Sequence, residues 1–185
     1  MYSKPILITA LASSIFLGVI ASSYGIKPAL PIKAEYQNLV PEAKKQVTCL
    51  AENIYFEAGY EPLDGKKAVA FVTMNRLHSG YADDVCSVVK QKTGSTCQFS
   101  WYCDSTFTNR MLTIKHTPLY NEILNIATTI YLNYERLPDV TNGSTYYHAD
   151  YVNPKWYKLA KEKQIGRHIF YKSDRDRIEK GIYYE

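Results

Sequence analysis

The stretch from Val47 to Ala58 constrains this chain most, because its apolar residues recur with the period of an α-helix. Glu57 projects about a quarter turn off the centre of that stripe, at roughly 100° per residue, and Phe56 points nearly opposite it. The pattern predicts a carboxyl group between two apolar surfaces at the end of a helix. The stripe consists of Val47, Leu50, Ala51, Ile54, Tyr55 and Ala58.

Glu57 is therefore a candidate general acid. Apolar surroundings make a carboxylate costly to ionise, so we expect the pKa of Glu57 to be raised. A raised pKa allows a carboxyl group to donate a proton near neutral pH. The alternative is an ordinary glutamate at the boundary of a well-formed helix, because a shifted pKa alone does not identify a catalytic group.

The 185-residue chain divides into four segments. Residues 1–26 carry a single charge, Lys4, and a long apolar run, which predicts either a cleaved secretory signal or one uncleaved membrane anchor. Both alternatives place the rest of the chain outside the cytoplasm. Residues 27–40 contain two prolines and are predicted to be a linker. Residues 41–174 are predicted to form one folded domain, followed by a charged tail over 175–185.

Two long helices are predicted at the start of the domain. The first begins near Pro41, because proline suits the first helical turn, and ends at Gly59 as a C-terminal cap. The second covers residues 65–77 behind Asp64 as its N-cap, and it is apolar nearly all round, which places it centrally in the core. Two polar residues near its end, Asn75 and Arg76, either solvate the helix terminus or reach back towards a cleft.

Three further elements are predicted in the middle of the chain. Asp83 or Asp84 caps a short helix over residues 85–89. Residues 97–104 alternate polar and aromatic side chains, which favours a short strand or an extended loop. Another helix starts at Thr117-Pro118 and stops before Pro138.

The last third of the domain predicts a small sheet. Asn142-Gly143 is a turn dipeptide and a candidate hairpin site. Residues 145–148 and 164–171 are predicted strands that pair with each other, and Asn153-Pro154 begins a short helical turn between them. Helices followed by a late sheet predict an α+β fold, mostly helical, with a small antiparallel sheet in the C-terminal half.

Tyrosine is abundant in this sequence, with 17 residues beside two tryptophans and six phenylalanines. A tyrosine offers an apolar face and a hydroxyl together, which suits sugar ligands, although most tyrosines simply fill half-buried surface. The net charge of +4 fits an anionic partner such as a cell-wall polymer or a membrane surface. The sequence has no arginine-rich run, helix-turn-helix signal or RNA-binding aromatic motif, so we expect no nucleic-acid partner.

The cysteines number four, and an even number behind an export signal favours disulfides. Three pairings are possible; we favour Cys86 with Cys97, which flank a loop, but the sequence leaves the pairing open. The rival is a zinc site, for which His148 and His168 would have to meet in space, since no HExxH motif is present. The candidate disulfide residues are Cys49, Cys86, Cys97 and Cys103.

Several blocks of sequence together resemble one family. They are NIYFEAGYEPLDGKKAVAFVTMNR at 53–76, VCSVV at 85–89, CQFSWYCD at 97–104, TYYHADYVNPKW at 145–156 and IGRHIFY at 165–171. In these blocks, and in their order, the chain resembles the SleB-type cell-wall hydrolases, which include the spore cortex-lytic enzymes. The resemblance runs from about Cys49 to Tyr171. The family often has Arg-Gly after the EA of its motif, where this chain has Gly59-Tyr60, a difference that bears on the mouth of the cleft.

The resemblance implies a lysozyme-like or transglycosylase-like domain that cleaves the glycan strands of peptidoglycan without a cofactor. It implies that Glu57 is the catalytic acid, and that cleavage between N-acetylmuramic acid and N-acetylglucosamine leaves 1,6-anhydro ends. One carboxyl group then acts first as acid and afterwards as base, whereas a hydrolase normally needs a second carboxylate. The candidates for a second carboxylate, or for tuning the pKa of Glu57, are Glu61, Asp104 and Asp150.

Further expectations concern binding and location. For each candidate substrate-binding residue, a packing or structural role is the alternative. We expect a monomer that is exported and acts in the periplasm or cell envelope, held to the membrane if its N-terminal segment stays uncleaved. Two other functions stay open, namely a non-catalytic peptidoglycan-binding or germination-accessory module and a zinc-dependent amidase. The candidate substrate-binding residues are Gln98, Ser100, Tyr146, Tyr147 and His148.

Overall fold

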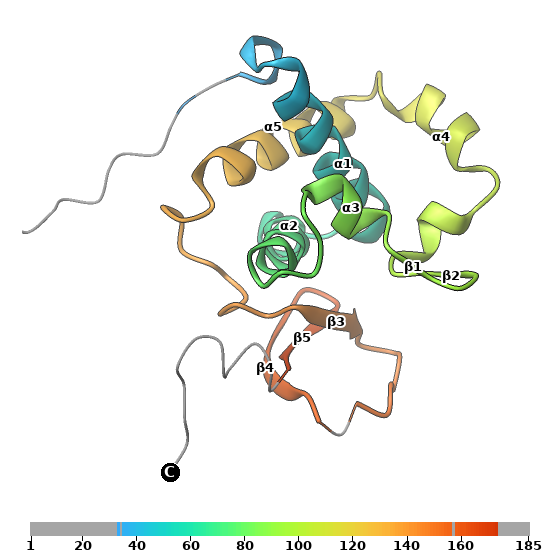
Figure 1. The fold of residues 1–185 in the computed structure, drawn as a ribbon, viewed down its shortest axis with the longest axis vertical. Coiled ribbons are helices and arrows are strands. Elements are labelled where there is room, and N and C mark those ends of the chain that lie inside the picture. Colours follow the sequence, from blue (N-terminus) through green and yellow to red (C-terminus); the bar gives the residue numbers. More distant parts are fainter. Residues whose placement is uncertain (1–32, 34, 157, 174–185) are drawn as a thin grey trace, which may run out of the picture.

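The computed structural model describes residues 33, 35–156 and 158–173 (Figure 1). The predicted signal or anchor, half of the predicted linker (residues 27–32 and 34) and the charged tail lie outside the described residues. Among the residues that are described, no helix combines the length and the apolar character that a membrane span requires.

A helical layer makes up most of the domain. Helix α1 (Pro41–Ala58) packs against α2 (Leu63–His78), α3 (Val85–Val89) and α5 (Pro118–Asn133) (Figure 1). The predicted stripe is confirmed, because every member except the half-buried Tyr55 is buried. The remaining elements of this layer are η1 (Tyr36–Asn38), β1 (Lys92–Thr93), β2 (Thr96–Cys97), η2 (Ser100–Cys103) and α4 (Phe107–Ile114).

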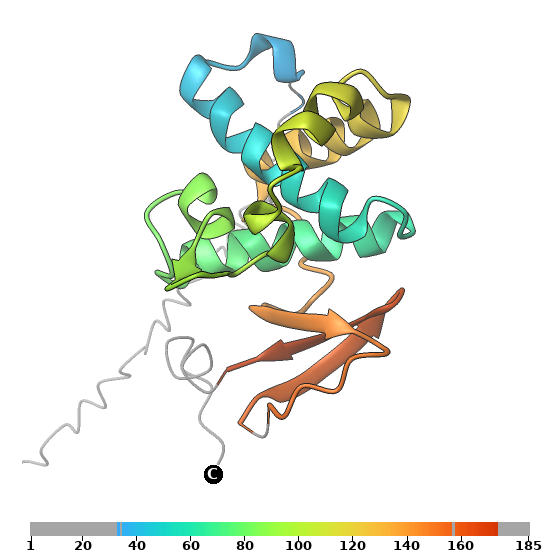
Figure 2. The same cartoon turned by 90° about the vertical axis from the view of Figure 1, so that its right-hand side faces the viewer.

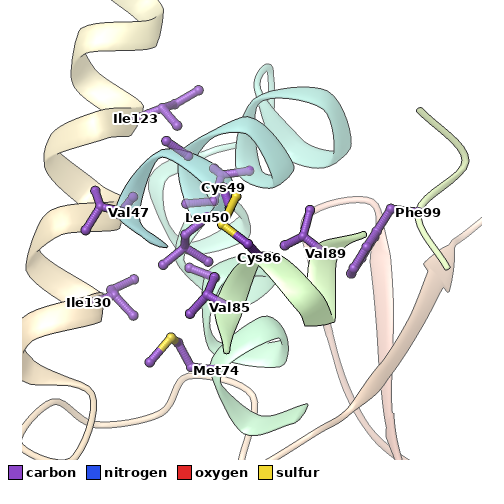
Figure 3. Close-up of a cluster of buried hydrophobic side chains, with 14 of the residues drawn as sticks. Val47, Cys49, Leu50, Met74, Val85, Cys86, Val89, Phe99, Ile123 and Ile130 are labelled. Atoms are coloured by element: carbon purple, nitrogen blue, oxygen red, sulfur yellow. A yellow bond between two sulfur atoms is a disulfide. The ribbon is translucent and has the colours of Figure 1, made fainter. Parts of the chain in front are cut away.

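The core of the helical layer is apolar and fully enclosed (Figure 3). Leu50 of α1 and Ile123 of α5 are 0% exposed, and Met74 of α2 packs in the same cluster. A disulfide between Cys49 and Cys86 joins α1 to α3 at the edge of this cluster. The middle of α1 is therefore held by apolar packing and by a covalent bond to α3.

The second disulfide joins Cys97 to Cys103, so the expectation of disulfides is confirmed and the favoured Cys86–Cys97 pairing is wrong. Packing of α3 on α1 brings Cys86 to Cys49, whereas the 3-10 turn η2 curls the chain back so that Cys103 meets Cys97. A loop that two cysteines flank does not by itself bring them together.

Local predictions succeed where a capping signal is clear. Asp84 caps α3 by accepting from the backbone N–H of Ser87, and Thr117 caps α5. The predicted cap at Asp64 is wrong, because α2 already starts at Leu63.

The aromatic segment after β2 differs from its prediction. Residues 100–103 form the 3-10 helix η2, so the buried Phe99 is extended and precedes this helix, whereas the buried Trp101 is part of it. Helix α4 was not predicted, although Phe107, Met111 and Ile114 recur at i, i+4 and i+7 and pack against the core.

A three-stranded antiparallel sheet forms the second layer (Figure 2), which confirms the predicted α+β fold. The predicted second strand is two strands, because Gly166, with a φ of 57°, turns the chain. Asn142 and Gly143 make a turn with positive φ, but it leads into the sheet instead of closing a hairpin, and residues 153–156 form no regular helix. The strands are β3 (Tyr146–Ala149), β4 (Ala160–Ile165) and β5 (His168–Lys172), in the order β3-β5-β4.

Helix α2 lies between α1 and the sheet (Figure 2). Its Ala68 and Val72 pack on Phe170 of β5 in a small apolar cluster. At its end, the Asn75 amide donates to the Ser144 carbonyl at 2.9 Å, and Nε of Arg76 donates to the Thr145 carbonyl at 2.6 Å. Both residues are buried, so they reach back to the sheet instead of solvating the helix end.

Candidate active site

Glu57 lies in the last turn of α1 and lines an open cavity of about 380 Å³. The walls of this cavity come from four places, namely α1, the α1–α2 connection, α4 and the β4–β5 turn. Helical packing therefore delivers Glu57 to a surface that both layers share. The lining residues are Tyr55, Phe56, Glu57, Ala58, Gly59, Tyr60, Glu61, Arg110 and Arg167.

The pKa of Glu57 is raised above its ordinary value, chiefly because burial penalises the carboxylate. Two groups oppose this effect: the Tyr147 hydroxyl donates to Glu57 Oε2 at 3.0 Å, and the positive charge of Arg76 acts through space. The carboxyl group is thus readily protonated, yet its carboxylate has two stabilising neighbours. Such a group can give a proton and take one back.

Tyr147 projects from β3 on the same face of the sheet as Phe170, its register partner on β5. Burial and the nearby Glu57 raise the pKa of its phenol well above the ordinary value, so at neutral pH the hydroxyl is a donor. The sequence suggested Tyr147 as a substrate contact, and the structure places it on Glu57 itself.

Arg76 also belongs to this site. A reach towards a cleft was one of two alternatives predicted for Arg76 from the sequence, but it was not included among the candidate site residues. Its guanidinium carbon lies 5.3 Å from the ring centre of Phe99 and 5.5 Å from that of Tyr146. With its amide oxygen turned towards the guanidinium, Gln98 accepts from Nη1 at 3.1 Å and from Nη2 at 3.2 Å. The available signal was an arginine inside a helix that is otherwise apolar nearly all round.

The remaining substrate candidates have contacts with other groups. Tyr146 accepts a hydrogen bond from the Tyr81 hydroxyl at 3.2 Å and lies beside Arg76. His148 lies on the opposite face of the sheet from Tyr147, where its Nε2 and the Tyr171 hydroxyl are 2.9 Å apart. Ser100 is exposed at the start of η2. The structure thus groups Gln98 and Tyr146 around Arg76, whereas His148 projects from the other face of the sheet than Tyr147, the partner of Glu57.

Each candidate second carboxylate is held by other groups. Glu61 lies beyond the end of α1 and accepts from the backbone N–H of Arg167 at 3.1 Å, against Gly166, where a Cβ would overlap it. Asp104 accepts from the Thr106 backbone at 2.8 Å and from Arg110 at 2.7 Å. Hydrogen bonds of this kind lower the pKa of Asp104.

Asp150 is held in the same way as Asp104. It pairs with Arg167 through three contacts of 2.9 to 3.3 Å, and these hydrogen bonds lower its pKa. Asp104 and Asp150 are therefore hydrogen-bonded carboxylates with a lowered pKa, whereas the pKa of Glu57 is raised.

A metal centre was the rival use of the cysteines and histidines. All four cysteines are in disulfides. His148 and His168 project from opposite faces of the sheet. Within the part of the chain that the structure describes, no three His, Cys, Asp or Glu residues gather as a metal site requires.

Comparisons with known proteins bear on the family and the fold of this chain. The profile of the cell wall hydrolase family matches residues 60–171. The match begins three residues after Glu57, so the assignment of Glu57 rests on its geometry and on the YFEA motif. No sequence among the curated proteins matches significantly.

Two solved structures have the same fold. One is the catalytic domain of the germination-specific lytic transglycosylase SleB from Bacillus anthracis, with a TM-score of 0.51 and 22% identity, covering 73% of this chain and 98% of that one. The other is the catalytic domain of the SleB protein from Bacillus cereus, with a TM-score of 0.50 and 23% identity, covering 73% of this chain and 94% of that one. At this identity the likeness establishes the fold.

Proposed function

This chain belongs to the cell wall hydrolase family, and on that premise we propose that it is a lytic transglycosylase with Glu57 as its one proton-transferring group. Its substrate is the peptidoglycan glycan strand, cut between N-acetylmuramic acid and N-acetylglucosamine. One observation carries the proposal: Glu57 is the carboxyl group on the cavity with a raised pKa, while Glu61, Asp104 and Asp150 are held by other donors.

The reaction needs one carboxyl group twice. Protonated Glu57 donates its proton to the glycosidic oxygen as the bond from that oxygen to C1 of N-acetylmuramic acid breaks. The C6 hydroxyl oxygen of the same sugar then bonds to C1, and the Glu57 carboxylate accepts the hydroxyl proton. Glu57 returns to its protonated state, and no water is consumed. The products are a 1,6-anhydro end and a free 4-hydroxyl end.

Hydrolysis would use a second, positioned carboxylate to activate water or to bond to C1. The three candidates for a second carboxylate are engaged elsewhere, because Glu61 accepts from the β4–β5 turn and the two aspartates pair with arginines. The Bacillus anthracis protein of similar fold is a lytic transglycosylase, which points to the same reaction.

The walls of the cavity suit a charged, hydroxyl-rich polymer. Arg110 and Arg167 carry positive charge with side chains 46% and 66% exposed, and Tyr60 is 93% exposed, so a sugar ring can stack on it. For sugars further along the glycan strand, Gln98 and Tyr146 are our first candidates for contacts, and Ser100 and His148 are the second. We further propose that the domain acts as an exported monomer, anchored if residues 1–26 are retained.

Glu57→Gln tests the proposal, with Glu52→Gln as a matched control. Glu52 is on the same helix, and burial raises its pKa too, but it faces Lys115 at 3.9 Å and does not line the cavity. We expect Glu57→Gln to abolish release of soluble muropeptides from purified sacculi while the variant stays folded, with a melting temperature no lower than that of the wild type. Glu52→Gln should keep activity. A folded Glu57→Gln variant that still solubilises sacculi would remove Glu57 from its role.

A further inference from the structure

Arg76 is the most enclosed charge at this site, and its surroundings assign it a role that Glu57 alone cannot fill. We infer that Arg76 is a positioning residue: from the end of α2 it fixes both the strand that carries Tyr147 and the orientation of the Gln98 amide. The inference rests on the proposed function and deepens it.

Burial of Arg76 is costly and lacks ordinary compensation. The residue is 3% exposed, and no ion pair within 4.0 Å among the described residues includes it. An unpaired buried charge costs several kcal/mol in general. Ring faces and hydrogen-bond acceptors offset part of that cost, since Phe99, Tyr146 and Tyr81 surround the guanidinium at 5.3 to 6.0 Å. A neutral residue would fill a merely structural position at lower cost.

The first contact of Arg76 sets the position of β3. Its Nε donates to the Thr145 carbonyl at 2.6 Å, while the preceding Asn75 donates to the Ser144 carbonyl at 2.9 Å. Two consecutive residues of α2 therefore hold two consecutive carbonyls at the entry to the strand. Tyr147 follows two residues later and reaches Glu57 at 3.0 Å. A shift of the strand entry would lengthen that hydrogen bond.

The second contact sets the orientation of Gln98. A guanidinium only donates, so the Gln98 amide is assigned with its oxygen towards Arg76, where it accepts from the two terminal nitrogens at 3.1 and 3.2 Å. The amide NH₂, with its two donors, is then directed away from Arg76. Because Gln98 is exposed, these donors are available to a carbonyl or hydroxyl oxygen of a sugar. Arg76 thereby makes Gln98 a donor and excludes it as an acceptor.

The charge of Arg76 also bears on the proton transfers. The charged and titratable groups around Glu57 come from every neighbouring element: Arg76 of α2, Tyr147 of β3, Arg110 of α4, and Glu61 with Arg167 near the β4–β5 turn. Arg110 and Arg167 are exposed and paired with aspartates, which leaves Arg76 as the buried cation of this set. Its field favours the Glu57 carboxylate that exists between donation and recovery of the proton.

Arg76→Gln and Arg76→Lys separate these effects, with Arg136→Gln at an exposed site as the control. We expect Arg76→Gln to lower kcat on soluble glycan chains by roughly 10- to 100-fold. The alkaline limb of its pH profile should move to higher pH, because the Glu57 carboxylate has lost a cation. Arg76→Lys should keep the alkaline limb of the wild-type pH profile, since it keeps the charge. It should lose about tenfold in kcat, because an ammonium group lacks the planar, forked donors of the guanidinium.

Two results would overturn the inference while wild-type glycan cleavage stands. One is a folded Arg76→Gln variant with wild-type kcat and pH profile, and the other is an Arg76→Lys variant with full activity. If Arg76→Gln does not fold, Tyr147→Phe provides the second arm: it should move the alkaline limb in the same direction, and an unmoved limb contradicts the positioning role. Absence of glycan cleavage by the wild type would instead refute the proposed function.

Discussion

The helical layer and the sheet are held together by different forces. The helical layer has a large apolar core in which Leu50, Ile54 and Ile123 are fully buried, and a disulfide closes its edge. The sheet has a small apolar contact with α2, and its entry is held by hydrogen bonds from Asn75 and Arg76. One layer is thus stabilised mainly by burial and the other mainly by directional polar contacts.

This difference explains where the site lies. Apolar packing positions a whole helix firmly but tolerates small shifts, whereas buried hydrogen bonds specify a position closely. Glu57 comes from the layer that apolar packing holds, and Tyr147 comes from the layer that polar contacts hold. The 3.0 Å hydrogen bond between them crosses the junction and reports on both layers.

The largest effect should come from the disulfide of the helical layer. Replacing Cys49 and Cys86 by alanine frees a loop with a separation of 37 residues, and chain entropy then predicts a loss of about 4 kcal/mol in the free energy of unfolding. The Cys97 and Cys103 pair, with a separation of 6, should cost about 2 kcal/mol. Urea titration of the two double variants measures both losses. Equal losses would contradict the expected difference between the two disulfides.

A smaller effect on stability, but a larger one on activity, is expected from Asn75→Ala. The change removes the donor to Ser144 and Asp139 and the acceptor of the Tyr134 hydroxyl, so the free energy of unfolding should fall by about 3 kcal/mol. Because β3 loses an anchor, glycan cleavage should fall further than stability alone explains.

Val47→Ala is the matched control, since Val47 is fully buried in the helical core and its apolar side chain offers no hydrogen bond to the entry of β3. Its loss of stability should be about 2 kcal/mol, with activity retained at temperatures where it is folded. Equal losses of activity in the two variants would show that the polar anchors have no special part in the site.

The smallest effect concerns the melting temperature of Glu57→Gln. A carboxyl group with a raised folded-state pKa stabilises the fold below its unfolded pKa and loses that contribution as pH rises through the folded value. Glu57→Gln should therefore melt higher than the wild type at pH 7, and the difference should vanish near pH 4. Asp104→Asn should show the opposite sign, because hydrogen bonds lower the pKa of Asp104. The same sign for both variants would contradict the assigned shifts.

Prediction from the sequence succeeded where a signal was local. The period of the α1 stripe placed Glu57 correctly at the boundary of a buried face, and caps at Asp84 and Thr117 fixed two helix starts. Contacts between distant segments had no local signal. The Tyr147–Glu57 hydrogen bond joins residues 90 positions apart, and Arg76 meets Thr145 across 69. The disulfide pairing failed for the same reason, because it depends on how α3 packs on α1.

The most direct test of the account is the mass of the soluble products released from peptidoglycan by the wild-type protein. A single carboxyl group that donates and recovers one proton predicts muropeptides lighter by one water than the products of hydrolysis, with 1,6-anhydro ends that resist borohydride reduction. Reducing-end muropeptides would contradict it, because they require a second carboxylate that Glu61, Asp104 and Asp150 do not offer in this arrangement.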